Sequence, residues 1–217
     1  MNSPLVEAPA PSEAGLESGG HAKGVAVALV TDNKDPDGLG RVKVRYPWHS
    51  GTHQSYWARV VSPMAGKDRG IYFVPEVDDE VLVAFERGDL RFPYVVGSLW
   101  NGKDKPPASN GDGKNDLRLI KTRKGHKLTF NDNSGSQGLV QLELNDGKKL
   151  SIDDNGITLD DGKGNSIVIK SNGGSIAITA KTDLSIKAPK IAIEATGTLD
   201  VKASGTLGLK GSLVNIN

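Results

Sequence analysis

The C-terminal stretch LSIKAPKIAIEATGTLDVKASGTLGLKGSLVNIN (184–217) carries the strongest structural signal in the chain. Pairs of apolar residues, separated by one small or polar residue, recur along it with no aromatic residue and a single proline. The pairs are Leu184/Ile186, Ile191/Ile193, Leu199/Val201, Leu207/Leu209 and Val214/Ile216. A period of two places both members of a pair on one face of a β-strand and the middle residue on the other. The pattern therefore predicts short strands joined by turns.

The same pattern begins upstream, with Leu128/Phe130 and Leu142/Leu144. From Leu150 to Val214 the first members of successive pairs stand 7 to 10 residues apart, with a mean of eight. Such an internal repeat predicts a solenoid or a stacked array. The turns between the pairs consist of Gly, Asn, Asp, Ser and Lys, and no unit is marked as different from the others.

Three identical chains wound around one axis explain this repeat better than a single-chain coil. Eight extended residues span at most ~27 Å, which is one side of a prism. In a trimer every unit is equivalent, each strand is hydrogen-bonded above and below to strands of other chains, and the edges disappear. We therefore predict an intertwined triple-stranded β-helix over 117–217. Its predicted core consists of Leu150, Ile152, Ile157, Leu159, Ile167, Ile169, Ile176, Ile178, Leu184, Ile186, Ile191, Ile193, Leu199, Val201, Leu207, Leu209, Val214 and Ile216.

The preceding region has a different composition, because ten of the eleven aromatic residues lie between Tyr46 and Trp100. Short alternating segments bounded by Gly, Pro, Asp or Asn predict five or six strands over 22–100, which favours a small closed barrel. Residues 1–21 are expected to form a flexible lead-in, and 101–116 a linker. The predicted barrel interior contains Val42, Val44, Val60, Phe73, Val81, Val83 and Val95.

Global composition narrows the possible functions. The chain has 217 residues, a net charge of +1 and no cysteine, so it carries no disulfide framework and no thiolate chemistry. Nothing in the overall charge favours nucleic acid. No stretch approaches the ~18 apolar residues of a membrane span, and no signal peptide is recognised.

Candidate catalytic and metal motifs are weak. His49 and His53 stand four apart, but they lie in a Ser-Gly-Thr loop without a third ligand. The stretch 97–104 resembles a phosphate loop but ends on Asp104 in place of Ser or Thr. The stretches 153–156 and 160–165 resemble calcium loops but lack their spacing, and turn chemistry explains them. The basic residues Arg118, Lys121, Arg123, Lys124 and Lys127 are expected to form a solvated face. We predict no catalytic residue, metal or cofactor.

Three motifs carry a resemblance to a known family: GRVKVRYPW (40–48), YWARVVSPMAGKDRGIYFVPEVDDEVLVAFERGDLRFPYVVGSLWN (56–101) and the trailing apolar pairs. Over 22–217 the chain resembles the spike proteins of contractile injection systems. These include the valine-glycine-repeat (VgrG) proteins of type VI secretion, phage baseplate assembly protein V and the spikes of extracellular injection particles. The resemblance implies an all-β fold, in which an OB-type barrel is followed by a trimeric β-helix needle. The needle would be driven through a target envelope when the sheath contracts.

The resemblance also implies partners and a location. The sequence contains neither the hub domains that precede the barrel in fused spikes nor an inserted muramidase domain. We therefore expect either a separate baseplate hub protein at the barrel end or a longer protein of which this sequence is a part. The C-terminus lacks the iron-binding His-x-His of some phage spikes. Leu213, Val214, Asn215, Ile216 and Asn217 are instead expected to form a flat platform for a PAAR-type tip protein. Effector cargo and transient contact with the target membrane are further expectations, with assembly in the cytoplasm and delivery to or through a target envelope.

Two other functions remain open at this point. A β-helical host-binding fibre or adhesin would also be long and repetitive, although it usually carries a distal receptor domain. A left-handed β-helix acyltransferase would need a six-residue period and a catalytic histidine, whereas here the period is eight and no histidine follows His126. The sequence favours the structural spike.

Overall fold

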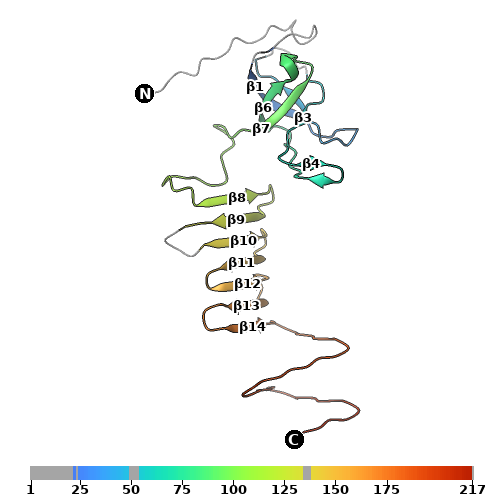
Figure 1. Ribbon diagram of the computed structural model, residues 1–217, viewed down its shortest axis with the longest axis vertical. Coiled ribbons are helices and arrows are strands. Elements are labelled where there is room, and N and C mark those ends of the chain that lie inside the picture. The colour runs from blue at the N-terminus through green and yellow to red at the C-terminus, as the bar shows by residue number, and fades with distance from the viewer. Residues whose placement is uncertain (1–21, 23, 49–53, 134–137, 217) are drawn as a thin grey trace. The chain divides into compact units, whose positions relative to one another are not determined.

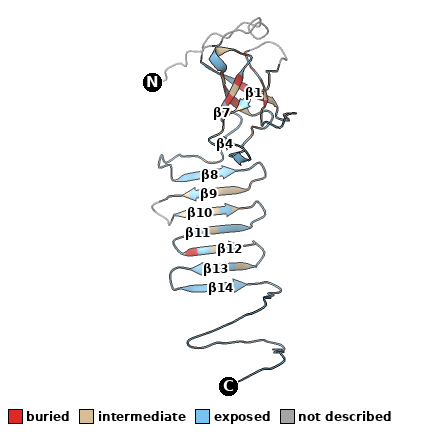
Figure 2. Ribbon diagram, turned by 45° about the vertical axis from the view of Figure 1, so that its right-hand side comes forward, coloured by how far each residue is buried: buried red, intermediate tan, exposed pale blue. Residues whose placement is uncertain are grey.

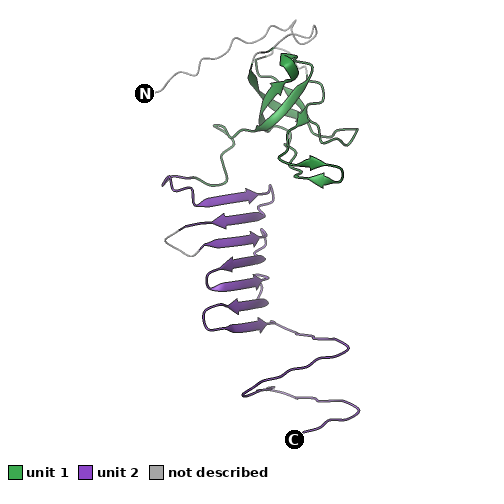
Figure 3. Ribbon diagram, viewed as in Figure 1, with its two compact units in different colours: residues 1–109 green, residues 110–217 purple. Residues whose placement is uncertain are grey.

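The computed structural model describes residues 22, 24–48, 54–133 and 138–216. Their regular structure is β, apart from one short 3-10 helix, η1 (Glu86–Gly88), so the predicted all-β class is confirmed. The chain divides into two compact units, residues 1–109 and 110–217 (Figure 3). A search for membrane-spanning helices in the described ranges finds none.

The first unit is a small barrel built from five strands. The strands are β1 (Val25–Asp32), β2 (Lys43–Arg45), β3 (Arg59–Val60), β6 (Glu80–Phe85) and β7 (Pro93–Ser98), in the order β2-β1-β6-β7-β3. All neighbours are antiparallel except β3 and β7, which are parallel. An antiparallel bridge between Val42 and Ala58, with N···O distances of 3.0 and 2.7 Å, joins the two outer strands. This bridge closes the sheet and satisfies edges that would otherwise be open.

The barrel interior is filled mainly by valines. Val42, Val44, Val81, Val83 and Val95 are fully buried, as the sequence predicts, and Val60 packs against them. The remaining buried side chains are Ala28, Val30, Tyr46, Ala58, Phe85 and Leu90. The prediction for Phe73 is wrong, because this side chain is 68% exposed. Residues 71–77 form no strand, so the alternation that would direct Phe73 inward does not apply there.

An ion pair organises the loop between β1 and β2. The Asp35 carboxylate accepts hydrogen bonds from the Arg41 side chain at 2.9 and 2.7 Å and from the backbone N–H groups of Asp37, Leu39 and Arg41. Its side chain is only 3% exposed. Hydrogen bonding to the Arg41 guanidinium, supported by the backbone N–H groups, holds the pKa of Asp35 well below its ordinary value of 3.8.

The second unit begins as a seven-stranded antiparallel meander (Figure 1). Its strands are β8 (Leu117–Lys121), β9 (Lys127–Asn131), β10 (Leu139–Glu143), β11 (Lys149–Asp153), β12 (Gly156–Asp160), β13 (Ser166–Lys170) and β14 (Ser175–Thr179). Each strand pairs with the strands before and after it in the same chain. The expectation that every strand would pair with other chains is therefore wrong for 117–179.

Tight turns explain why the meander pairs with itself. The connections 122–126, 144–148 and 161–165 are each closed by the same hydrogen bond, from the N–H of the first residue to the C=O of the fifth, at 2.8 to 3.1 Å. Gly147 and Gly162 have φ values of 92° and 69° in these turns, a conformation that glycine adopts without steric cost. These turns send the chain straight back along its own preceding strand.

The chain changes behaviour after β14. No strand occurs in the described residues 180–216, although the apolar pairs continue there. No residue in this range has a positive φ, so no left-handed residue reverses the chain. The last five units of the repeat therefore run on in extended form without strand partners in their own chain (Figure 1).

The Asp35–Arg41 pair predicts a specific pH dependence. Because the folded pKa of Asp35 lies below its unfolded value, the ionised pair stabilises the barrel above about pH 4, and this contribution is lost as the pH falls towards the folded pKa. Asp35→Asn should lower the barrel's unfolding temperature at neutral pH. It should also make that temperature less dependent on pH between about pH 5 and pH 2. Asp37→Asn is the control, since Asp37 is mostly exposed. Equal pH profiles for wild type and Asp35→Asn would contradict this assignment.

Tyr46 predicts an unusual substitution effect. Its ring is buried, stacks on Trp48 with centroids 5.0 Å apart and contacts Phe85 at 5.8 Å. Its hydroxyl has no hydrogen-bond partner among the described residues, and burial raises its pKa. Tyr46→Phe removes this buried polar atom and should raise the free energy of unfolding by about 1 kcal/mol in urea titrations. Tyr46→Leu, which loses the ring contacts, should lower it; a loss of stability in Tyr46→Phe would mean that the hydroxyl is paired.

Candidate functional site

The register of the meander aligns its apolar residues into two ladders on one face of the sheet. Directly paired residues point to the same side, and residues two apart share a face. One ladder contains Leu128, Leu142, Leu150, Leu159, Ile167 and Ile178. The other contains Phe130, Val140, Ile152, Ile157, Ile169 and Ile176. We call this surface the apolar face.

The apolar face is largely uncovered in the single chain. All twelve side chains are partly or strongly exposed. Within β10–β14 their exposed fractions range from 37% for Ile169 to 71% for Ile176. Ser151 and Thr158, on the opposite face, are less exposed than the isoleucines beside them. Figure 2 shows the buried residues, in red, concentrated in the barrel, and the second unit mostly tan and pale blue. An exposed apolar patch of this extent indicates an assembly surface.

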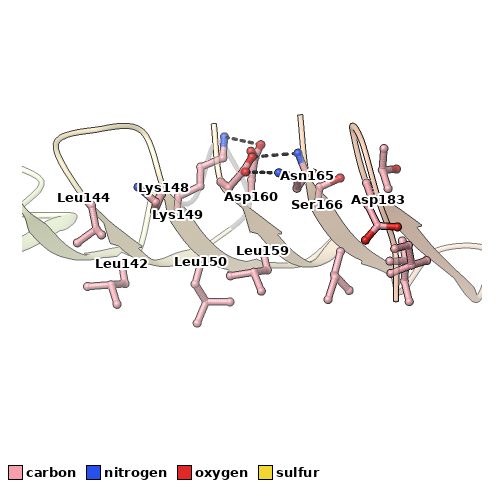
Figure 4. A pocket seen from close by; sticks show the side chains of 16 residues that line it. Leu142, Leu144, Lys148, Lys149, Leu150, Leu159, Asp160, Asn165, Ser166 and Asp183 are labelled. Atoms are coloured by element: carbon pink, nitrogen blue, oxygen red, sulfur yellow. Dashed lines mark hydrogen bonds and ion pairs between the residues drawn. The ribbon is translucent and has the colours of Figure 1, made fainter. Parts of the chain in front are cut away.

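Figure 4 shows the apolar face from close by. The side chains of Leu142, Leu150 and Leu159 project from one side of the sheet, whereas Lys148 and Asp160 lie on the other. Leu142, Leu150, Leu159, Ile167, Ile178 and Leu184 line an open groove of about 550 Å³. Lys148, Lys149, Asp160, Asp161 and Asp183 also line the groove. Its apolar side chains suit the side chains of another apolar surface.

The opposite face of the sheet is polar and charged. Lys127, Glu143, Lys149 and Asp160 stand directly opposite one another on successive strands. Lys127 Nζ lies 3.3 Å from Glu143 Oε2, and Lys149 Nζ lies 4.0 Å from Asp160 Oδ2. Opposite charges that face each other on neighbouring strands stabilise this strand register relative to a register shifted by one residue. The sheet is therefore two-sided, with one face suited to water and the other to a buried contact.

The predicted core residues fall into two groups. Those from Leu150 to Ile178 are brought together on the apolar face. Those from Leu184 to Ile216 lie in the extended segment, where the single chain brings none of the pairs into a sheet and every member is exposed. Of the predicted tip platform, Leu213, Val214 and Ile216 are exposed, whereas Asn217 lies outside the described residues.

The structure also shows what the sequence pattern missed. The pair on β10 is Val140 and Leu142, because Val140 stands opposite Phe130 and Ile152. Leu144, which the spacing paired with Leu142, lies in the connection to β11. Val140 lies two residues before Leu142, so the period-two rule permits either pairing and only the register distinguishes them.

The turn motifs have local structural explanations. Asp161 Oδ1 accepts the N–H of Lys163 at 2.8 Å and of Asn165 at 2.9 Å, and these bonds, with that of the Asn165 side chain, lower the pKa of Asp161 to about 2. Asn101 Oδ1 accepts the N–H of Lys103 and Asp104 at 2.9 and 2.7 Å, which makes 97–104 an exit turn of the barrel. No group of three or more potential metal ligands occurs in the described parts of the chain.

Other candidate residues are only partly accounted for. His49 and His53 lie outside the described residues. In the basic run, Arg118 pairs with Asp132 at 2.6 Å and Lys127 with Glu143. These ion pairs support a solvated, partly neutralised surface.

Comparison with known proteins matches both units. Residues 26–100 match the type VI secretion system/phage-baseplate injector OB domain. Residues 118–176 match the phage baseplate V C-terminal trimerisation domain, and this range covers most of the apolar face. Over these two ranges the chain resembles phage baseplate V proteins, so the resemblance noted from the sequence is confirmed, and most of the apolar face lies within the matched trimerisation domain.

Several curated relatives are type VI spike proteins. The chain is 33% identical to the spike protein VgrG3 of Vibrio cholerae over 112 residues, which covers 48% of this chain and 11% of the relative. It is 37% identical to the spike protein VgrG2a of Pseudomonas aeruginosa over 92 residues, covering 41% and 11%. It is 32% identical to the actin cross-linking toxin VgrG1 of Vibrio cholerae over 109 residues, covering 46% and 10%. The matched region thus spans about a tenth of the length of these relatives.

Gly156 offers a test of the meander. It follows the two-residue turn between β11 and β12 with φ 145°, and a Cβ placed there would lie 1.8 Å from the Ile169 carbonyl oxygen. Gly156→Ala should therefore break the β12–β13 ladder and lower the free energy of unfolding by ~3 kcal/mol or more, measured by circular dichroism in urea. Gly138→Ala is the matched control, because its nearest contact would be an ordinary 3.6 Å. Equal stability of the two variants would contradict the β12–β13 register.

Proposed function

We propose that the chain is the central spike of a contractile tail or injection machine. The barrel would join the baseplate hub to the needle, and the needle would concentrate the force of sheath contraction on a small tip. The single observation that carries this proposal is the uncovered apolar face within a matched trimerisation domain. The names of the relatives support it, since several are type VI spike proteins.

The proposed trimer core has two parts. In the meander, Leu150, Ile152 and the other apolar-face residues of three copies would meet around the threefold axis. In 180–216, the extended segments of three copies would pair with one another. This second part is supported by the exposed pairs from Leu184/Ile186 to Val214/Ile216 and by backbone groups that find no strand partner in their own chain. Folding of this region and trimerisation would be coupled.

The proposed division of labour follows the predicted ranges. Residues 22–100 form the adaptor barrel, 101–116 the linker and 117–217 the needle, with 1–21 as a lead-in. A separate hub protein would bind at the barrel end. A PAAR-type protein would cap the platform formed by three copies of Leu213, Val214, Asn215, Ile216 and Asn217. The exposure of Leu213 and Ile216 supports this cap, because an open apolar prism end is unfavourable in water.

The proposed mechanism is mechanical and involves no chemical turnover, cofactor or nucleic acid. Paired strands resist separation because many hydrogen bonds, each contributing ~1 kcal/mol, must break together. The spike would assemble in the cytoplasm, contact the target membrane transiently and carry effector cargo with the tip. One relative is named an actin cross-linking toxin, but the matched region covers 10% of it.

The braided segment is tested by substituting one apolar pair. Ile191→Asp together with Ile193→Asp buries six carboxylates in the proposed trimer core and should abolish the trimer, giving a monomer by light scattering. Ala192→Asp is the matched control, because the middle residue faces away from the pair and the trimer should survive. The wild-type trimer should also resist SDS without boiling.

The functional test uses the same variants in a producing cell. The double variant should leave the sheath able to assemble but abolish delivery into target cells, whereas Ala192→Asp should deliver normally. A double variant that remains trimeric would contradict the proposed core. A trimeric chain whose isolated needle binds glycans or cells saturably would favour a host-binding fibre instead.

A further inference from the structure

The barrel carries an apolar surface on its outside, where strand alternation normally places polar residues. Val27 stands opposite Leu82, and Val25 stands opposite Ala84, all directed away from the buried positions Ala28 and Val83 of the same strands. We call this surface the strand face. It consists of Val25, Val27, Leu29, Leu82, Ala84 and Val96 on β1, β6 and β7. Val25 is 58% exposed and Val96 46%.

A second exposed apolar surface surrounds the small hairpin of β4 (Ala65–Gly66) and β5 (Arg69–Gly70), which projects from the barrel (Figure 1). A groove of about 660 Å³ runs along its base. We call this surface the hairpin patch. Its apolar members are Leu39, Val61, Met64, Ile71, Tyr72 and Phe73, and all of them are exposed.

The hairpin patch is firmly held. Ser62 Oγ lies 2.9 Å from the Met64 carbonyl oxygen and 2.7 Å from that of Ile71, and the Ile71 N–H donates to Met64 at 3.0 Å. A Cβ at Gly40 would lie 3.5 Å from the Tyr72 ring, so this ring rests against the loop that Asp35 and Arg41 organise. The apolar side chains are thus presented on a preorganised surface, which reduces the entropic cost of docking.

The trimer explains why one barrel needs two different apolar surfaces. In a threefold ring each subunit contacts its neighbours through a heterologous interface, so one surface of each copy meets a different surface of the next copy. A twofold pair would require only one self-complementary patch. The trimerisation domain holds three barrels on linkers of 16 residues (101–116), which reach up to ~55 Å when extended. Such tethering gives millimolar effective concentrations, so even a modest apolar contact forms.

We propose that the hairpin patch of each barrel packs on the strand face of the next barrel, closing a ring of three barrels. The occupant of each surface is therefore a second copy of this chain. The inference rests on the trimer of the proposed function, and it adds a contact outside the matched trimerisation domain. The apolar members of both surfaces suit a buried contact. Charged residues border them, namely Asp68 and Arg69 at the hairpin patch and, directly opposite Leu29, Arg45 and Glu80 at the strand face.

Cross-linking of the full chain tests the ring. The chain contains no cysteine, so Met64→Cys on the hairpin patch and Val27→Cys on the strand face introduce the sole thiols, and both changes keep an uncharged side chain at the position. A short bis-maleimide should convert the double variant into covalent dimers and trimers on boiled denaturing gels. Each single variant should give at least about tenfold less product, since like surfaces do not meet in a heterologous ring. Adding Val25→Asp to the double variant should abolish the product without changing the native mass.

The outcomes separate this inference from the proposed function. A double variant that is trimeric by light scattering but yields only monomer bands overturns the ring and leaves the spike intact. Efficient cross-linking in a single variant overturns it too, because it indicates contact between like surfaces. A native monomer overturns the trimer and the ring together.

Discussion

The apolar face of the second unit is the constraint on which the molecule depends. Two ladders of leucine, isoleucine, valine and phenylalanine side chains run along one side of a seven-stranded sheet, and the chain provides nothing to cover them. Each apolar side chain that moves from water into a buried contact contributes roughly 1.5–3 kcal/mol. An antiparallel sheet can leave one face in water. Here the face suited to water is the opposite one, which carries the charged residues Lys127, Glu143, Lys149 and Asp160. The matched trimerisation domain supports our proposal that other copies of the chain cover the apolar face.

Turn chemistry then determines how the chain uses this face. Up to Gly174, glycines with positive φ reverse the chain, and each strand returns alongside its predecessor. Beyond that point the same apolar pairs continue with no left-handed residue, and the described chain forms no further strand of its own. The presence of glycines with positive φ thus distinguishes 117–179, which pairs within one copy, from 180–216, which we propose pairs between copies. In this proposal the first region forms its strand pairs within one chain, whereas the second would form them only between three chains.

The barrel shows the same coupling between local structure and assembly. Its interior is small and filled by valines, and the sheet closes through the Val42–Ala58 bridge. Large apolar side chains that do not fit, including Tyr72 and Phe73, lie on the hairpin patch. These exposed apolar residues form the surfaces that we propose contact other copies of the chain.

The period-two pattern was sufficient to predict the all-β class, the barrel valines and the apolar pairs, whereas the resemblance to the baseplate family came from the motifs at 40–48 and 56–101 together with the trailing pairs. It predicted these features because strand alternation is a local rule that holds whichever strand lies alongside. It wrongly placed Phe73 inside the barrel, because residues 71–77 resemble a strand in sequence but form none. It also assigned Leu144 to the pair that Val140 occupies, since a period of two permits either choice.

The sequence by itself determined which residues share a face and that this face must be buried, because side-chain polarity and alternation are encoded locally. Only the tertiary structure decided which strands pair, since hydrogen bonding of the backbone is independent of residue type and depends on how the turns direct the chain. For this reason the meander of 117–179, the transition at Thr179 and the two apolar surfaces of the barrel became visible only in three dimensions.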